Sequence, residues 1–316
     1  MKFLLLCSAL VLGICCNAKE LKVLMVGNSF SQSVLAFLPR IVKADPENTL
    51  ILGQCMIGGC TLERHCKEYK KSAEDPTYRP YSTNLKFPDR KGRKASLQEL
   101  LDAEKWDIVT VQQGSHMSWK PESFKFADEL IGYIRKHNPQ AEIVVHQTWA
   151  YRLDDGRITT VDKGWKIGQQ GMYDRLTENY TNLAKKYNAR IIPVGYAVQL
   201  TREKSPVKFK MYDPQKLKEL KPPELPEQDG DVVGRIYWRK DKKTGETKLW
   251  KDTIHLNPDG NYLQACVWYM FLFDKKASDV KFVPKKLKFD AKFLADCAED
   301  QRRAPLLIWM VTSVWK

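Results

Sequence analysis

Closely spaced cysteine pairs, the usual ligands of structural zinc, are absent from this 316-residue sequence: no two cysteines have only two residues between them. Histidine is also scarce, with five residues. His65 lies between Cys60 and Cys66, but this spacing matches no zinc pattern. We therefore expect neither a metal nor another cofactor.

Long apolar runs are missing after residue 20, since none approaches the roughly 18 residues that span a bilayer. We therefore expect no transmembrane span. The first 18 residues differ, with Lys2 before the apolar run Phe3–Cys16 and Ala18 at its end. This pattern is typical of a secretory signal peptide cleaved before Lys19, and predicts a periplasmic or extracellular protein. A lipoprotein signal ending at Cys15 or Cys16 is the alternative, although Ile14 or Cys15 is then a poor small residue before the modified cysteine.

Five cysteines remain once residues 1–18 are removed: Cys55, Cys60, Cys66, Cys266 and Cys297. An oxidising compartment favours a disulfide among them. Any pair of the first three is close in sequence, and the last two fall on C-terminal helical segments. The odd number leaves at least one thiol free, and the sequence does not decide the pairing.

The net charge is +14, but the lysines and arginines are spread along the chain rather than gathered in one block. Their densest stretch, residues 202–251, is interleaved with Glu, Asp and Pro. We therefore expect no nucleic-acid partner. An exported basic protein meets acidic polysaccharide or an anionic cell surface, and a solvated lysine-rich surface is the simpler alternative.

Apolar segments alternate with helical patterns through the first two thirds of the chain. Each apolar segment is rich in Val, Ile and Leu, as in strands covered on both faces. The expected strands are Leu21–Gly27, Thr49–Cys55, Asp107–Gln113, Ala141–Thr148 and Arg190–Val194. The expected helices are Ser31–Ala44, Pro121–Lys136, Gly171–Tyr187, Pro258–Phe273 and Asp290–Arg302. This order predicts a three-layer α/β/α sandwich with a five-stranded parallel sheet, flavodoxin-like in class.

Residues 202–251 interrupt that alternation with polar, proline-containing sequence. Val232–Trp238 and Glu246–Trp250 flank a glycine turn, which predicts a β-hairpin. We interpret the stretch as an insertion in a single domain covering residues 19–316, placed to wall a site.

Ser29 follows the first expected strand, in Gly27-Asn28-Ser29-Phe30-Ser31. A serine there lies at the carboxyl end of a parallel sheet, where open α/β folds place their sites. The following helix N-terminus offers N–H groups to an oxyanion. The alternative is that Ser29 and Ser31 only cap the helix.

Asp252 and His255 can supply what a serine nucleophile needs, a base and a carboxylate that fixes the tautomer of that base. Three residues apart on one loop, they come from one backbone segment. An Asp-x-x-His pair is common by chance, so the continuation to Asn257-Pro258-Asp259-Gly260 and a helix carries the specificity.

Together these segments resemble the conserved blocks of SGNH (GDSL-like) hydrolases, most of all a poorly characterised bacterial branch. The Ser29 segment is similar to the block written Gly-Asp-Ser-Leu, and Asp252–Gly260 is similar to the last block. Gly58-Gly59-Cys60 resembles the second block, which implies that the Gly59 N–H serves an oxyanion hole. In the third block, aligned on Gly114, the family's Asn donor is replaced by His116. Either Gln113 or His116 is expected to take its role.

Trp149 and Tyr151 close the fourth expected strand at the same edge of the sheet. Their position allows two interpretations, a platform for a sugar ring in the substrate site or a packed strand end.

The resemblance and the expected export predict a serine esterase that acts on an ester, an O-acetyl group of a carbohydrate, through Ser29, His255 and Asp252. The missing Asn supports an alternative, a non-catalytic glycan-binding protein that keeps the fold. A third hypothesis is a basic protein held on a surface by anionic polymer, whose binding falls steeply with salt.

Overall fold

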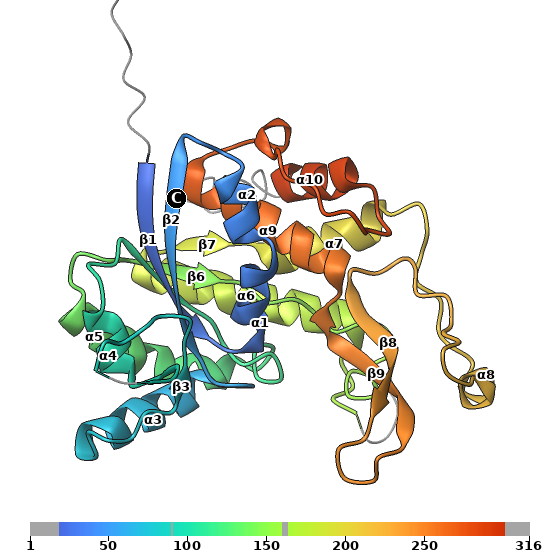
Figure 1. The fold of residues 1–316 in the computed structure, drawn as a ribbon, viewed down its shortest axis with the longest axis horizontal. Helices are drawn as coiled ribbons and strands as arrows, with labels where there is room; N and C mark the ends of the chain where they lie inside the picture. The colour runs from blue at the N-terminus through green and yellow to red at the C-terminus, as the bar shows by residue number, and fades with distance from the viewer. Residues whose placement is uncertain (1–18, 90, 160–163, 301–316) are drawn as a thin grey trace, which may run out of the picture.

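A seven-stranded sheet runs through the computed structural model, which describes residues 19–89, 91–159 and 164–300 (Figure 1). The strand order is β4-β3-β2-β1-β5-β6-β7. The parallel strands are β1 (Lys19–Gly27), β2 (Asn48–Met56), β5 (Ile108–Val111), β6 (Glu142–His146) and β7 (Arg190–Ile192). The short strands β3 (Tyr81–Ser82) and β4 (Lys94–Ala95) extend the sheet antiparallel. The predicted five parallel strands are confirmed, and β3 and β4 are additions.

Strand β1 lies in the middle of the sheet, between β2 and β5. Its residues Val23, Leu24, Met25 and Val26 are at most 1% exposed, with no alternation between faces. Continuous burial of this kind is what a parallel sheet covered by helices requires. The sheet therefore holds the residue after β1, Asn28, and the nucleophile candidate Ser29 on a rigid support.

Helices cover both faces of the sheet and give the three layers that the sequence predicts (Figure 1). One layer holds α1 (Ser29–Gln32), the 3-10 helix η1 (Ser33–Ala36), α2 (Leu38–Lys43), α9 (Pro258–Phe273) and α10 (Ala291–Asp300). The other holds α3 (Leu62–Glu74), α4 (Leu97–Asp102), η2 (Pro121–Phe126), α5 (Ala127–His137) and α6 (Gly168–Tyr187). Helix α7 (Val194–Lys204) contacts both α6 and α9.

The single helix expected over residues 31–44 is three short pieces, α1, η1 and α2. Pro39 explains the break before α2. Proline supplies no N–H and clashes with a preceding helical turn, so it belongs in the first turn of a helix. It occupies that position in α2, and Phe37 before it leaves helical geometry with φ −132° and ψ −28°.

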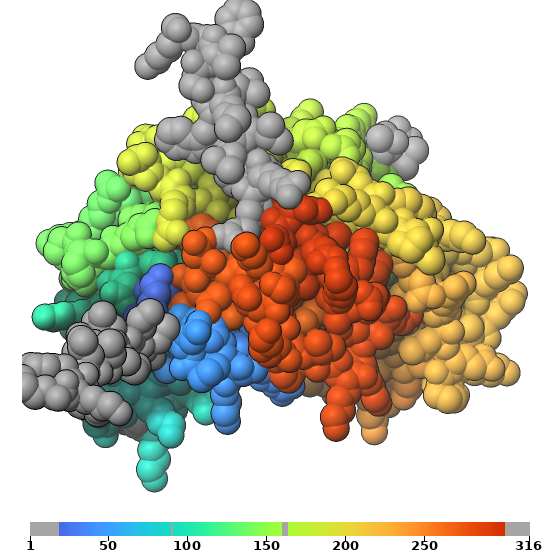
Figure 2. Space-filling view, turned by 90° about the horizontal axis from the view of Figure 1, so that it is seen from above, coloured from blue at the N-terminus to red at the C-terminus, as the bar shows by residue number. Residues whose placement is uncertain are grey.

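The stretch expected to be an insertion contains the short helix α8 (Pro214–Glu219) and most of a two-stranded sheet of β8 (Val233–Lys240) and β9 (Thr247–Leu256). Figures 1 and 2 both place it at one end of the molecule. The predicted hairpin is present, but β9 continues well past Trp250. Asp252 and His255 consequently lie on a strand and not on a loop.

The cysteines that the structure describes are all buried and all free thiols. The expected disulfide is therefore wrong for this structure, including the pair Cys266 and Cys297 on α9 and α10. Within the described ranges, no three His, Cys, Asp or Glu residues are grouped to hold a metal ion. No helix built from those residues has the length and apolar character to cross a bilayer. The predicted signal peptide and the apolar end 306–315 lie outside the described residues.

Asp45 ties α9 to the turn between α2 and β2. Its carboxylate is 8% exposed and accepts hydrogen bonds from Tyr269 (2.7 Å) and Asn48 (2.6 Å). Burial alone would raise the pKa of this carboxyl, but these bonds, the Glu47 N–H and Lys275 lower it to about 2. The charged form is therefore the one that the fold stabilises.

We expect Asp45→Asn to lower the free energy of unfolding at pH 7 by about 1–2 kcal/mol. Because the folded pKa lies below the unfolded value of about 3.9, this stabilisation is present above pH 4 and is lost as the pH falls towards 2. Urea unfolding of both proteins at pH 7 and pH 3 measures it. A stability gap of equal size at the two pH values would contradict this account.

Candidate active site

Ser29, His255 and Asp252 are joined by hydrogen bonds although the serine lies 226 residues before the histidine. His255 Nε2 is 3.0 Å from Ser29 Oγ, and His255 Nδ1 is 2.9 Å from Asp252 Oδ2. Ser29 opens α1 directly after β1, and the other two residues come from the end of β9. Hydroxyl, imidazole and carboxylate follow one another in the order found in a serine-hydrolase triad.

Asp252 is oriented by its own backbone. Its Oδ1 accepts hydrogen bonds from the N–H groups of Ile254 (3.0 Å) and His255 (3.1 Å), which leaves Oδ2 for the imidazole. Burial alone would raise the pKa of this carboxyl, but the His255 ring and the two N–H groups hold it well below its usual range. Asp252 is therefore ionised at neutral pH and faces the Nδ1–H of a neutral or charged imidazole.

Asn28 joins the serine segment to the loop after β2. Its amide group donates to the Cys60 carbonyl (2.9 Å), while its oxygen accepts from the Phe30 N–H (3.0 Å) and from Gln112 Nε2 (2.7 Å). An aspartate at this position would lack the donor for Cys60. The preference for Asn at helix N-caps makes the capping role of Asn28 predictable from the sequence. Its hydrogen bond to Cys60 is visible only in the folded structure.

Two backbone N–H groups near Ser29 have no acceptor among the described residues. One belongs to Ser29, the first residue of α1, where helical donors are unpaired. The other belongs to Gly59, which is exposed on the turn after β2. Gly59 has φ +62°, a conformation that favours glycine. The bond from Asn28 to Cys60 fixes this turn beside the serine segment.

The profile of the family described as "Domain of unknown function (DUF4886)" matches residues 22–210, more than half of the chain. The chain belongs to the DUF4886 family. A crystal structure of a DUF4886 protein from Bacteroides uniformis is 27% identical, with a TM-score of 0.67, over 91% of this chain and 96% of that one. The matched profile ends before β9, so it includes Ser29 but not Asp252 or His255.

More distant solved structures are similar to this DUF4886 chain. A putative SGNH hydrolase from Slackia heliotrinireducens is 17% identical, with a TM-score of 0.45 and coverage of 80% of this chain and 100% of that one. An acetyl xylan esterase is 15% identical, with a TM-score of 0.43 and the same coverages. No curated protein matches the sequence.

Trp149 and Tyr151 are buried in the DUF4886 fold, at 0% and 1% exposure, so the expected sugar platform is wrong. Trp149 stacks on Phe30 with ring centroids 4.0 Å apart, and its Nε1 donates to the Ile254 carbonyl at 2.8 Å. Phe30 in turn contacts the His255 ring edge-on. Trp149 thus contacts both α1 and β9 and holds these two elements together.

The segment after Trp149 fastens β9 further. The Arg152 N–H donates to the Thr253 carbonyl (2.9 Å), and the Thr253 hydroxyl donates to the buried carboxylate of Asp155. Asp155 also pairs with Arg157, whose charge acts on both Asp252 and His116. Arg157 is therefore a cation beside the site, and no motif in the sequence pointed to it.

Gln113 does not have a free donor for an oxyanion. Its Nε2 donates to the Ser123 carbonyl and hydroxyl, both at 3.0 Å, and its Oε1 accepts from the Leu62 and Gly114 N–H groups. The side chain is 1% exposed and holds the loops together, which corrects the expectation for this residue.

His116, the other residue expected to donate to the oxyanion, is exposed on the loop after β5. Its ring lies close enough to Gly114 that a β-carbon there would be 3.3 Å from it. Burial of part of the ring lowers the pKa of His116, and Lys120 and Arg157 lower it further. The imidazole is therefore neutral near pH 7 and keeps one N–H to donate.

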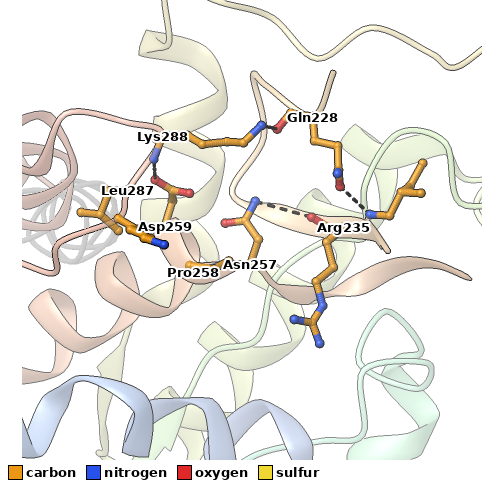
Figure 3. Close-up of a pocket in the computed structure, with 10 residues that line it drawn as sticks. Gln228, Arg235, Asn257, Pro258, Asp259, Leu287 and Lys288 are labelled. Atoms are coloured by element: carbon orange, nitrogen blue, oxygen red, sulfur yellow. Dashed lines mark hydrogen bonds between the residues drawn. The ribbon is translucent and has the colours of Figure 1, made fainter. Parts of the chain in front are cut away.

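A pocket of about 270 Å³ lies behind the His255 segment, between β8, the start of α9 and the chain at residues 286–288 (Figure 3). Asn257 caps α9 at its edge, accepting from the Gly260 N–H and donating to the Asp231 carbonyl. Asp259 accepts from the N–H groups of Lys288 and Phe289. These bonds hold the end of β9 and the first turn of α9 in place.

Gly260 allows α9 to approach the residue before β8, since a β-carbon there would lie 2.2 Å from the Val232 carbonyl oxygen. We expect Gly260→Ala to cost about 1–3 kcal/mol of stability through overpacking and to displace His255. Gly132→Ala is the matched control, because Gly132 is exposed on α5 with nothing within 4 Å of a β-carbon. It should gain up to about 1 kcal/mol. Urea unfolding of both variants checks this, and equal shifts would contradict it.

Proposed function

We propose that this protein is a serine hydrolase that cleaves carboxylic esters, with Ser29 as nucleophile, His255 as general base and acid, and Asp252 as the orienting carboxylate. The observation that carries the proposal is the unbroken chain of hydrogen bonds from Asp252 through His255 to Ser29, at 2.9 and 3.0 Å. Ser29 and His255 are only half-buried, so a substrate can reach them.

In the first half of the reaction, Ser29 Oγ attacks the ester carbonyl while His255 Nε2 takes the hydroxyl proton. The tetrahedral intermediate collapses when His255 returns that proton to the leaving alcohol, and an acyl-Ser29 ester remains. Water then adds to the acyl carbon while His255 takes its proton, and the acid leaves when the bond to Ser29 Oγ breaks and His255 returns the proton to that oxygen. Asp252 keeps the proton of the imidazole on Nδ1, so Nε2 is free to accept.

The oxyanion is proposed to lie between the N–H groups of Ser29 and Gly59. His116 would be a third donor, in place of the Asn that SGNH hydrolases have in their third block. The first two donors belong to the backbone and need no side-chain ordering during the reaction. Each such donor contributes on the order of 3 kcal/mol to transition-state stabilisation. The positive end of the peptide dipoles around Ser29 favours the same charge.

For the substrate, we propose an ester carried by a carbohydrate, with O-acetyl as the acyl group, met outside the cytoplasm. The expected signal peptide at residues 1–18 and the +14 net charge support this choice. The second candidate remains a glycan-binding protein without catalysis. The observation in its favour is that His116 stands at the position of the Asn donor of SGNH hydrolases.

Labelling with a fluorophosphonate separates the two candidates, because only an activated serine hydroxyl reacts with it. We expect stoichiometric labelling at Ser29, located by peptide mass spectrometry, and none at Ser31, whose hydroxyl donates to the Asn28 carbonyl instead of facing His255. An unlabelled Ser29 in folded protein would favour the glycan-binding candidate.

A further inference from the structure

One face of the β8–β9 hairpin carries aromatic rings between guanidinium groups. In the strand register Arg235 lies opposite Asp252, Tyr237 opposite Trp250 and Arg239 opposite Lys248. Directly opposite residues of an antiparallel pair project to the same side. Arg235, Tyr237, Arg239 and Trp250 therefore share one surface, which we call the hairpin face.

The side chains of the hairpin face are stacked on one another. The Arg235 guanidinium lies 4.7 Å from the centre of the Tyr237 ring, and that of Arg239 lies 5.0 Å from the Trp250 ring. Such contacts hold a guanidinium flat while its N–H groups stay available. Trp250 is nonetheless 40% exposed, an unusual exposure for so large an apolar ring.

The opposite face of the hairpin is already covered. Trp238 Nε1 donates to the Glu224 carbonyl at 2.7 Å, the Ile236 N–H donates to Gln228, and the Ile236 side chain is 2% exposed. In Figure 3 the Arg235 side chain points away from Gln228 and Lys288, the residues that lie on that covered side. The hairpin face is thus the side that is open to a ligand.

The two guanidinium groups make no direct ion pair within the described ranges, although the charge of Arg239 acts on the nearby carboxylate of Asp241. Neither Arg235 nor Arg239 forms an ion pair with any residue there, whereas nearby Glu246 is paired with Lys248 at 2.9 Å. Asp252, opposite Arg235, already accepts the His255 ring. Two exposed, unpaired arginines beside two aromatic rings favour an anionic ligand with a ring to stack.

The hairpin face also leads to the proposed nucleophile. Strand β9 carries Trp250 at its outer part and Asp252 and His255 further on, so the face and the triad share one strand. Arg239 and Arg235 lie on the same strand four residues apart, about 13 Å at the usual rise per residue. A chain that contacts both arginines is therefore directed along β9 towards Ser29.

We propose that the hairpin face binds an acidic polysaccharide, with sugar carboxylates on Arg235 and Arg239 and sugar rings against Trp250 and Tyr237, and holds it across Ser29. The choice of a glycan among polyanions rests on the proposed function. Planar guanidinium groups bind carboxylates through paired hydrogen bonds, and a flat aromatic ring offers its apolar face to the C–H groups of a sugar.

The test measures binding of polygalacturonate to the Ser29→Ala protein by calorimetry at low salt, with uncharged dextran as the neutral probe. Working with Ser29→Ala makes binding independent of hydrolysis, and hydrolysis of p-nitrophenyl acetate by the unmodified protein tests the proposed function separately. The variant is Arg235→Gln with Arg239→Gln. Its matched control is Lys216→Gln with Lys218→Gln, which removes two exposed charges from α8 in the same insertion.

We expect polygalacturonate to bind more tightly than dextran, and the arginine variant to weaken that binding about tenfold or more. The lysine variant should change it less than about twofold, because diffuse surface charge contributes little to a specific contact. Thermal melting confirms that both variants are folded. Equal weakening in the two variants, preference for dextran, or tighter binding of poly(U) RNA through the same arginines would each overturn the proposal.

Discussion

Replacement of Ser29 by alanine is expected to reduce kcat for p-nitrophenyl acetate by about 10⁴–10⁶, the range that loss of a triad nucleophile produces. The hydroxyl that attacks is removed, and His255 has no proton to accept at that position. Stability should change little, since Ser29 is half-buried and its hydroxyl has no hydrogen-bond partner among the described residues besides the His255 ring. Initial rates with purified protein and a thermal melt provide the measurement.

Ser31→Ala is the matched control for this experiment. It removes the same atom two residues further along α1, where the hydroxyl donates to the Asn28 carbonyl at 2.9 Å. Its loss should lower the rate by no more than about tenfold, the equivalent of one ordinary hydrogen bond. If the two alanine variants lost activity equally, Ser29 would not be the nucleophile.

Asp252→Asn is expected to lower kcat by about 10⁴ while leaving the fold intact. The reason lies in the two backbone N–H groups that donate to Asp252 Oδ1. They hold the oxygen of an asparagine at the same place, so its NH₂ group faces His255 Nδ1. That nitrogen must then act as acceptor, the ring proton moves to Nε2, and the ring no longer accepts the proton of Ser29.

The rate of Asp252→Asn, measured between pH 6 and 9 beside the unmodified protein, checks the expectation. A value within about tenfold of the unmodified protein would show that the carboxylate does not set the tautomer, against the role that such carboxylates have in hydrolases. Because its hydrogen bonds from the His255 ring and from two backbone N–H groups outweigh burial and keep the pKa of Asp252 well below its usual range, its own titration should not appear in this pH interval.

The sequence identified the residues that the structure brings together because each motif is local. Gly27–Ser31 and Asp252–Gly260 are short segments that include a helix start. Their resemblance to two blocks of SGNH hydrolases implied that they act together. The catalytic roles of Ser29, His255 and Asp252 stay a prediction until activity is measured.

Trp149, Tyr151 and Gln113 were misjudged for a different reason. Each lies at the expected edge of the sheet, but its exposure depends on segments distant in sequence. Ile254 and Phe30 bury Trp149, and the Ser115 hydroxyl bonds to Tyr151 at 2.8 Å. Ser123 uses the donors of Gln113. Local pattern gives the strand end, whereas the partners that cover it follow only from the packed fold.

Strand length was the other limit. Lys251, Asp252 and Thr253 after Trp250 are all polar, and the expectation was a short strand ending at Trp250 followed by a loop. The backbone bonds of β8 continue the strand to Leu256, and a register shift between Val233 and Arg235 accommodates it. Strand β9 therefore carries Asp252 and His255, so the β8–β9 hairpin is part of the candidate site rather than a wall beside it.

The separation of Ser29 and His255 by 226 residues has a consequence for the newly made chain. A ribosome that has released β1 and most of the sheet has still not made the segment that would activate the serine. Non-local contacts of this kind also form late in folding, since a long loop must close first. On the proposed mechanism the chain is inactive until β9 has been made, and recovery of the proposed esterase activity after denaturation would report the last step of folding rather than the first.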